Sequence, residues 1–498
     1  MLFPALVGPS YTLRSRNIDA EAAINLFVET VASAGNAKKS TLIGTPGLKY
    51  FLTIPHLRCR GFFSEDGRTF VVVGTQLWEI NVDGATAVIR GSVPDDGLPV
   101  FFASNGRGGE QLAISGGGYL LIFNFVTNAL VGVAIPLTHA PLTVRFLDGY
   151  FLLLEKDSIR VWYSNLENGL VWDALDFFAR SQVSDNLVGM DILRGRIWLF
   201  GSKKTEVFYD SGDADNPFVP YPGSTMEEGL VSPYAEAILG EAVIWVSQDA
   251  EGHGRVVRAS DYAPERISTP AIDVALATYP TVSDCEVLVY EQEGHPFAAF
   301  TFPQGGILGG EDGVTWCYDE REQAWHQRAS WDEARGVFTR WRARGGVAAG
   351  QQPILVGDFA TGDLYTLDLN TFQDNGVTIR RLRRTPYVSD ENQWLFLDRV
   401  ELGIESGVGL AAPVGLLTGP GVDPQLWLRV SRDGGHTWGA SMTAAMGRMG
   451  LYLTRAIWRR LGRVRADRLV IEITQTDPVR AIWGPGAWLK ATPGSGEL

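Results

Sequence analysis

The side chains that could bind a metal or act as nucleophiles are few and lie far apart in this sequence. The histidines form no His-x-x-x-His pair, and the cysteines form no Cys-x-x-Cys pair. We therefore expect no metal site, no disulfide framework and no cofactor. The residues concerned are His56, His139, His253, His295, His326 and His436, together with Cys59, Cys285 and Cys317.

Motifs for nucleophilic catalysis and phosphate binding are also missing. The sequence contains neither a Gly-x-Ser-x-Gly elbow nor a Walker loop. The glycine run at 116–118 leads into a predicted strand, so it lacks the helix N-terminus that holds phosphate. The oxygen-rich segment 210–216 lacks the glutamate that completes an EF-hand loop. Acidic pairs at 95–96 and 227–228 lie in predicted turns. We expect no catalytic residues and no enzymatic activity.

One short motif, residues 431–438, resembles the Asp box of sialidases. Its aspartate can accept hydrogen bonds from turn amides, its glycines permit a left-handed backbone, and its tryptophan can pack under the loop. In sialidases this motif is structural and remote from the catalytic centre, so we expect a stabilised turn. A glycosidase stays an alternative, and it would need two carboxylates about 5 to 9.5 Å apart at a propeller mouth. The turn residues are Ser431, Asp433, Gly435, Thr437 and Trp438.

The densest basic cluster, residues 457–465, has an aromatic residue inside it. Two interpretations are open: a contact with phosphates or with a partner's carboxylates, or a strand whose arginines face solvent. The alternation favours a strand with Leu461 and Val464 turned inward. The candidate contact residues are Trp458, Arg459, Arg460, Arg463 and Arg465.

Length and charge narrow the class of protein. The chain has 498 residues, whereas single cores stop growing near roughly 250 to 300 residues, so we expect at least two domains. A net charge of −14 argues against a protein that holds duplex DNA by neutralising phosphates. Acidic residues predominate before residue 376 and basic residues after it.

Neither a signal peptide nor a membrane helix is expected. Residues 1–7 do not have the pattern of a signal peptide. Prolines break the uncharged stretch 406–422, so we expect no membrane contact.

Repeated hairpins run through most of the chain. Short apolar strands alternate with glycine turns at Gly74, Gly117, Gly149, Gly195 and Gly240, spaced near the ~40 to 50 residue period of propeller blades. We expect an all-β protein: a β-propeller at 51–375 and an antiparallel β-sandwich-like domain at 376–498. Residues 1–50 are expected to form an extended arm with a short helix at 19–27. The alternative is an irregular series of hairpins in a sandwich.

Several segments together resemble a known family. They are 24–29, 44–48, 185–190, 200–209 and 458–465, in that order. The resemblance is to the tail hub or nozzle proteins of short-tailed bacteriophages, described as packaged-DNA stabilisation or tail accessory proteins. It spans most of the chain.

The resemblance implies a structural virion protein of the tail, assembled in the host cytoplasm. It implies a homohexamer below a dodecameric adaptor, with a tail needle or plug and with tailspikes or tail fibres nearby. DNA would pass through the ring without sequence-specific binding, and we expect a negative bore to repel phosphates. A propeller-type glycan-binding protein is the other alternative. Besides the basic cluster, the expected assembly contacts are Asn25, Leu26, Phe27, Glu29, Pro46 and Gly47.

Overall fold

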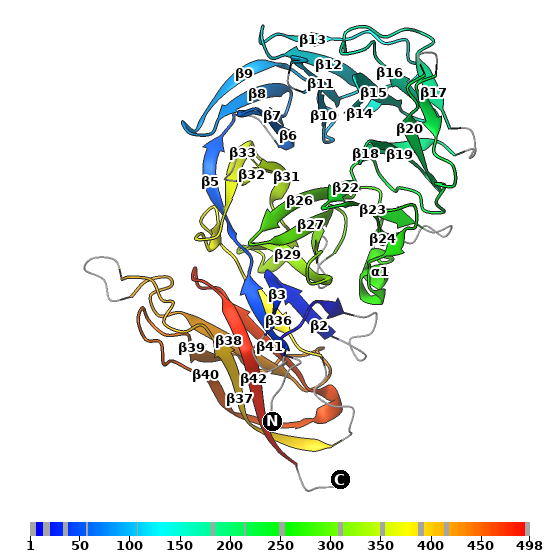
Figure 1. Cartoon of the computed structure of the whole chain (residues 1–498). Coiled ribbons are helices and arrows are strands. Elements are labelled where there is room, and N and C mark those ends of the chain that lie inside the picture. The colour runs from blue at the N-terminus through cyan, green and yellow to red at the C-terminus, as the bar shows by residue number, and fades with distance from the viewer. Residues whose placement is uncertain are drawn as a thin grey trace.

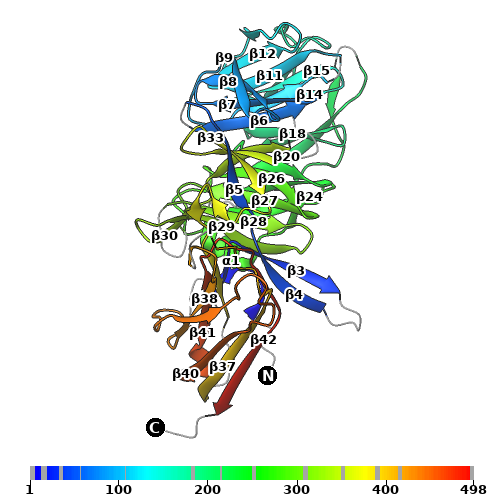
Figure 2. The same ribbon diagram turned by 90° about the vertical axis from the view of Figure 1, so that its left-hand side faces the viewer.

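The computed structural model consists of a ring of small β-sheets with a layered β-domain attached to its rim (Figure 1). In the view turned by 90°, the ring lies above and the layered domain below (Figure 2). The two expected architectures, a β-propeller and a β-sandwich, are therefore both present. The structure describes residues 6–12, 20–32, 38–55, 58–106, 108–180, 185–213, 216–248, 254–306, 312–348, 354–386, 393–412 and 418–493.

Five blades are consecutive four-stranded antiparallel sheets. Their central strands are apolar on both faces, because each blade packs between two neighbours. The strands are β6 (Cys59–Glu65), β7 (Arg68–Val73), β8 (Gln76–Asn81), β9 (Thr86–Ser92), β10 (Phe101–Ser104), β11 (Gln111–Gly116), β12 (Tyr119–Asn124), β13 (Leu130–Gly132), β14 (Pro141–Leu147), β15 (Tyr150–Glu155), β16 (Arg160–Tyr163), β17 (Phe177–Ala179), β18 (Leu187–Leu193), β19 (Arg196–Gly201), β20 (Thr205–Asp210), β21 (Phe218–Pro220), β22 (Glu236–Leu239), β23 (Ala242–Gln248), β24 (Gly254–Ala259) and β25 (Glu265–Arg266).

Two further blades close the ring. The innermost strands β6, β10, β14, β18, β22, β26 and β31 contact one another in this cyclic order, so the described chain forms a seven-bladed propeller. The outer strand of the last blade is β5, which pairs with β33 and comes from the N-terminal region. The strands are β26 (Glu286–Gln292), β27 (His295–Phe302), β28 (Val314–Asp319), β29 (Ala324–Asp332), β30 (Val337–Arg340), β31 (Ala343–Ala348), β32 (Ile354–Asp358), β33 (Asp363–Asp368), β5 (Gly47–Thr53), β34 (Gln373–Asp374) and β35 (Val377–Thr378).

The glycines predicted to mark hairpins all lie in hairpin turns. Each has a positive φ, which side chains with a Cβ adopt only at a cost. The regularly spaced glycines therefore correctly predicted the hairpin turns of the blades. The φ values are 54° at Gly74, 59° at Gly117, 90° at Gly149, 69° at Gly195 and 58° at Gly240.

The helix predicted at 19–27 is wrong. The segment forms two strands separated by Asn25, whose φ is 57°. Ala22 and Ala23 pair with Arg384 and Arg383, and these tertiary pairings outweigh the modest helix propensity of an Ala- and Glu-rich stretch. The N-terminal strands are β1 (Tyr11–Thr12), β2 (Ala20–Ile24), β3 (Leu26–Ala32) and β4 (Lys38–Gly44).

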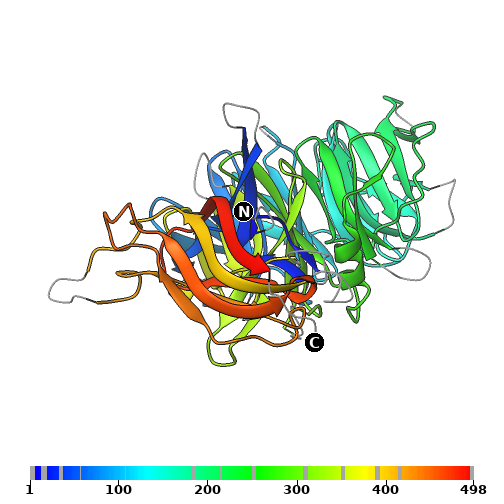
Figure 3. The same cartoon turned by 90° about the horizontal axis from the view of Figure 1, so that it is seen from below.

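The sandwich shares a sheet with the propeller. The sixth blade continues from β29 through β2 and β36 to β41, β38 and β39, while β3, β4, β42, β37 and β40 form the opposing sheet. Seen from below, the sandwich lies under one side of the propeller, and the β18–β25 blades extend beyond it (Figure 3). The strands are β36 (Arg381–Arg384), β37 (Trp394–Ile404), β38 (Gln425–Ser431), β39 (Met442–Ala445), β40 (Ala456–Arg465), β41 (Val470–Gln475) and β42 (Ile482–Pro493).

Helical structure is scarce in the described part of the chain. The helix α1 (Pro270–Leu276) begins after Thr269, whose side chain accepts a hydrogen bond from the Ile272 amide, and a 3-10 turn spans Ala466–Arg468. Among the described residues, no helix has the length and apolar character needed to cross a membrane.

Candidate interaction surfaces and the propeller axis

The predicted basic cluster lies on β40, at the edge of the second sandwich sheet. Trp458, Leu461 and Val464 are buried, whereas Arg459 and Arg463 are exposed. The expected alternation is therefore present, and it leaves the arginines on the outer face. Arg460, with a φ of 59°, is exposed as well, and Arg465 is half-buried beside Asp467.

Aromatic side chains lie beside these arginines. The Arg463 guanidinium stacks 4.1 Å from the ring centre of Trp394. Phe396, opposite Arg463 in the strand pairing, is 46% exposed, and Trp488 is 40% exposed. Exposed arginine and aromatic side chains together are typical of protein interface centres. This β37/β40 face, defined by Trp394, Phe396, Arg459, Arg460 and Arg463, is the candidate interaction surface of the sandwich.

The outer edge of β40 is covered by another arginine. Arg432 donates from Nη2 to the Leu461 carbonyl oxygen at 2.9 Å and from Nε to the Arg463 carbonyl oxygen at 3.1 Å. An open strand edge would invite pairing with another chain. Because Arg432 occupies these acceptors, contacts at the β37/β40 face are expected through side chains.

The N-terminal contact residues are mostly buried within the chain itself. Asn25, Leu26 and Phe27 are at most 2% exposed. Pro46 and Gly47 are also buried. Their expected role as contacts with a partner is therefore wrong, because their side chains already pack against the propeller and the sandwich.

One N-terminal candidate keeps an accessible side chain. Glu29 is half-buried on β3. The expectation of an extended arm fails for most of these residues: β2, β4 and β5 pair with strands of the folded body. Among the described strands, β3 pairs only with β4. β2 and β5 therefore belong to the body, whereas the β3–β4 hairpin that carries Glu29 projects from it (Figure 2).

The expected domain boundary at residues 375–376 is followed closely by β36, a central strand of the sheet that the two domains share. All four side chains of β36 are buried. Arg384 donates to Glu472 Oε2 at 2.7 Å, and Arg429 donates from Nε to Glu472 Oε1 at 3.0 Å. Arg383 bonds the carbonyl oxygens of the N-terminal segment and pairs with Glu21. The sequence analysis did not single out these arginines, because charged side chains are rarely buried unless they are paired.

The Asp-box-like motif is a turn, as expected. Asp433 accepts from the amides of His436 at 3.0 Å and Thr437 at 2.9 Å and from the Ser431 hydroxyl at 2.7 Å. Partial desolvation opposes ionisation, but the bonds from Thr437 and its neighbours lower the pKa of Asp433. Trp438 is half-buried beneath the guanidinium groups of Arg384 and Arg429.

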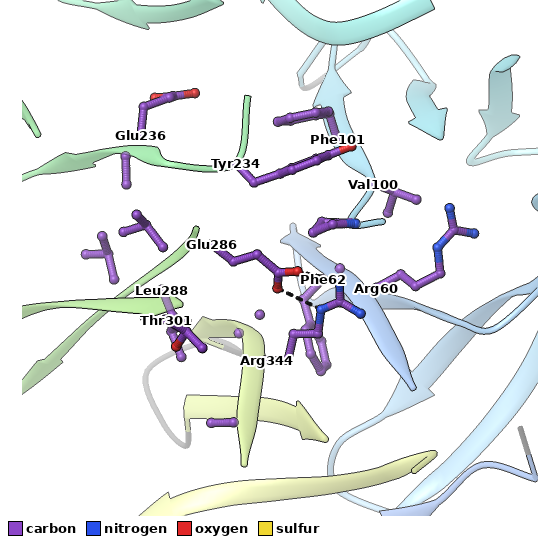
Figure 4. A pocket seen from close by; sticks show the side chains of 18 of the residues that line it. Arg60, Phe62, Val100, Phe101, Tyr234, Glu236, Glu286, Leu288, Thr301 and Arg344 are labelled. Atoms are coloured by element: carbon purple, nitrogen blue, oxygen red, sulfur yellow. Dashed lines mark hydrogen bonds and ion pairs between the residues drawn. The ribbon is translucent and has the colours of Figure 1, made fainter. Parts of the chain in front are cut away.

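The propeller axis is filled by side chains. Phe101 and Tyr234 stack with ring centres 5.1 Å apart, and Arg344 forms a two-bond pair with Glu286 at 2.6 and 2.7 Å (Figure 4). A cavity of about 330 Å³ remains beside them. Side chains of the described residues therefore occupy much of the axis and leave a small, partly open cavity there.

The His295–Asp319 pair and the three cysteines are buried, whereas His139 and His436 are exposed. His295 Nδ1 lies 2.7 Å from Asp319 Oδ2, but both side chains are only 2% exposed. All three cysteines are free and buried, and burial raises the pKa of Cys59 to about 12. Among the residues described, no three His, Cys, Asp or Glu side chains group as metal ligands. His56 and His253 lie outside the described residues.

These features define a rigid two-domain scaffold: a closed seven-bladed propeller that shares a sheet with a β-sandwich and presents a basic, aromatic outer face. Comparisons of the sequence with family models give its family. The chain belongs to the bacteriophage P22 Gp10 family: the β-propeller model matches residues 4–372 and the β-sandwich model matches residues 380–481. This is the tail hub family of short-tailed phages, so the chain is a structural, non-enzymatic component of the virion tail.

Other comparisons are more distant. No curated protein matches the sequence significantly. Among solved structures, YCF48 from Cyanidioschyzon merolae is 13% identical with a TM-score of 0.42, covering 64% of this chain and 98% of its own. The N-terminal domain of Nup159 is 9% identical with a TM-score of 0.41, covering 69% and 98% respectively. The Myceliophteria thermophila Cps50 (Swd1) propeller is 7% identical with a TM-score of 0.41, covering 64% and 98%.

Proposed function

We propose that six copies of the chain form a ring in the phage tail, directly below a dodecameric adaptor. The ring is a conduit for DNA during ejection, helps to retain the packaged genome, and supports a needle or plug and the tailspikes or tail fibres. Membership in the P22 Gp10 family supports this proposal. The shared sheet between propeller and sandwich supports it physically, because a scaffold that carries load during ejection needs rigid joints.

The observation that carries the proposal furthest is the filled propeller axis. Duplex DNA is far wider than a cavity of about 330 Å³ can admit. DNA therefore passes between copies, around the axis of the ring, and not through any single propeller. The acidic excess before residue 376 would let DNA slide past without binding wherever propeller surface lines that passage.

The β37/β40 face is the proposed assembly contact of the sandwich. Arg459, Arg460 and Arg463 have no ion-pair partner among the described residues. Free guanidinium groups beside exposed aromatic rings suit a partner surface that offers carboxylates. The adaptor is the proposed partner at this face, and Glu29 on β3 is a second candidate contact.

Light scattering with the purified adaptor ring tests both parts of the proposal. The wild-type chain should assemble to six copies, alone or when the adaptor is added. The double variant Arg459→Glu and Arg463→Glu should lose adaptor binding by at least tenfold, because it reverses two charges at the face. Arg321→Glu, an exposed charge reversal on the propeller, is the matched control and should bind normally.

Two outcomes would contradict the proposal in different ways. A wild-type chain that stays monomeric with adaptor present would refute the ring. A double variant that binds adaptor as well as Arg321→Glu does would leave the ring intact but refute the assigned face. The thermal midpoint of each variant checks that the substitution has not unfolded the sandwich.

A further inference from the structure

The cavity on the propeller axis is lined by six of the seven innermost strands, β6, β10, β14, β22, β26 and β31. Side chains from separate blades converge there, as the sticks in Figure 4 show. A concave site with a few polar groups among apolar walls is the usual form of a small-molecule site. Neither the tail-hub role nor the assembly contacts make use of this cavity.

Most of the cations at this cavity are already neutralised. Arg344 pairs with Glu286 through two hydrogen bonds of 2.6 and 2.7 Å. Arg60 donates to Asp96 at 2.8 Å. Each of these pairs holds its two side chains in place as part of the cavity wall, and each carboxylate neutralises its arginine.

Arg145, a third lining cation, is neutralised in the same way. It donates to Asp191 at 2.7 Å and to Glu236 at 3.1 Å. The second carboxylate oxygen of Glu236 is buried and has no hydrogen-bond partner among the described residues. The carboxylates of Asp191 and Glu236 are thus both held against Arg145.

Arg340 is the exception. It lines the cavity with its guanidinium 3.6 Å from the ring centre of Phe359. No described residue forms a hydrogen bond or an ion pair with this guanidinium. Burying a stacked and unpaired guanidinium in part costs free energy unless an anion or solvent forms hydrogen bonds with it. Its stacked, planar donors match the geometry of a carboxylate.

The cavity that Arg340 lines has apolar as well as charged walls. Phe62, Val100, Ile238 and Leu288 line the same cavity. An inorganic anion would satisfy the guanidinium but leave this surface against water, whereas an organic acid would cover both. We propose that the axial cavity binds a small organic carboxylate, with its carboxylate on Arg340 and its apolar part against these walls.

Calorimetric titration of the full-length protein with benzoate tests this site. Benzoate combines a carboxylate with a flat apolar ring. Benzamide has nearly the same shape without the charge, and inorganic phosphate has the charge without the ring. Benzoate should bind at least tenfold more tightly than either. Arg340→Gln should weaken benzoate binding at least tenfold, and Arg340→Lys, which keeps the charge but loses the fork, should fall between.

Arg335→Gln is the matched control, because Arg335 lies on the same β29–β30 hairpin, pairs with Asp312 and Asp332, and does not line the cavity. Equal binding of benzoate and benzamide would overturn the proposal. An equal loss of benzoate affinity in Arg340→Gln and in Arg335→Gln would also overturn it. A crystal of the wild-type protein with 4-bromobenzoate provides a test that needs no variant. Bromine density within the axial cavity is expected, and its absence there at saturating ligand would also overturn the proposal.

Discussion

Asn25 and Ala329 exchange two hydrogen bonds. The Asn25 side-chain amide donates to the Ala329 carbonyl oxygen at 2.9 Å, and the Ala329 amide donates to Asn25 Oδ1 at 2.9 Å. The same side-chain amide also donates to the Arg380 carbonyl oxygen at 2.9 Å. One buried residue thus joins the β2–β3 break to the sixth blade and to the start of β36.

Replacing this residue should destabilise both domains together. Asn25→Ala leaves buried backbone groups of Ala329 and Arg380 unsatisfied, and each such group costs about 1 to 3 kcal/mol. We expect a loss of about 3 kcal/mol in the free energy of unfolding, measured by urea denaturation. Asn370→Ala, at a polar turn position, is the control and should change it by under about 0.5 kcal/mol. A loss no larger than that of the control would show that these bonds contribute little.

Gly47 should tolerate no side chain, because the strand that closes the propeller passes very near the backbone at this position. A Cβ on Gly47 would lie 2.6 Å from the Thr371 carbonyl oxygen, with the Gln373 carbonyl oxygen nearer still. We expect Gly47→Ala to lower the free energy of unfolding by about 3 kcal/mol. Gly132→Ala is the control, since its nearest neighbour is 3.8 Å away. Matching thermal midpoints for the two variants would argue against a tight closure.

His326 should make the protein less stable in mild acid. Burial, with nearby Arg328 adding to it, lowers the pKa of His326 from 6.5 to about 3 in the folded protein. Between pH 6.5 and 3, the unfolded chain therefore binds a proton at this histidine that the folded chain does not bind. As the pH decreases across that window, the free energy of unfolding falls by about 1.4 kcal/mol per pH unit.

The comparison of His326→Gln with wild type isolates this effect. Asp374 acts in the opposite direction, because burial raises its pKa to about 6 and favours the folded state as pH falls. Asp374 is present in both proteins, so its contribution cancels in the difference. We expect the wild type to lose about 2 kcal/mol relative to the variant between pH 7 and 5, measured by urea unfolding. A difference independent of pH would mean that His326 is not buried in its neutral form.

Asp433 should order its turn without supporting the whole domain. Asp433→Ala removes the acceptors for the His436 and Thr437 amides, and we expect a loss of about 1 kcal/mol in the free energy of unfolding. Hydrogen exchange at these two amides should accelerate while β41 stays protected. Asp423→Ala, an exposed acid elsewhere in the sandwich, is the control. Unchanged exchange at both amides would contradict the assigned role.

Features that depend only on neighbouring residues could be predicted from the sequence. Turn glycines, alternating strands and the Asp433 turn are specified within a few residues, because hairpin geometry is local. The all-β class, the two regions and the inward and outward faces of β40 followed from the same signals. The family resemblance added the tail role, which no local motif indicated.

The pairing of distant segments could not be predicted in this way and is seen only in the folded protein. Residues 20–24 were predicted to be helical, and the domain boundary was predicted just before β36. The two segments instead pair with each other as buried strands where the propeller meets the sandwich. The number of blades depended on β5 joining β33 across more than three hundred residues. Burial of Arg383 and Arg384 depends on partners such as Glu21 and Glu472 that are remote in sequence. Charge patterns in a sequence do not reveal such partners, because a buried arginine is stable only once the fold has supplied its carboxylates and carbonyls.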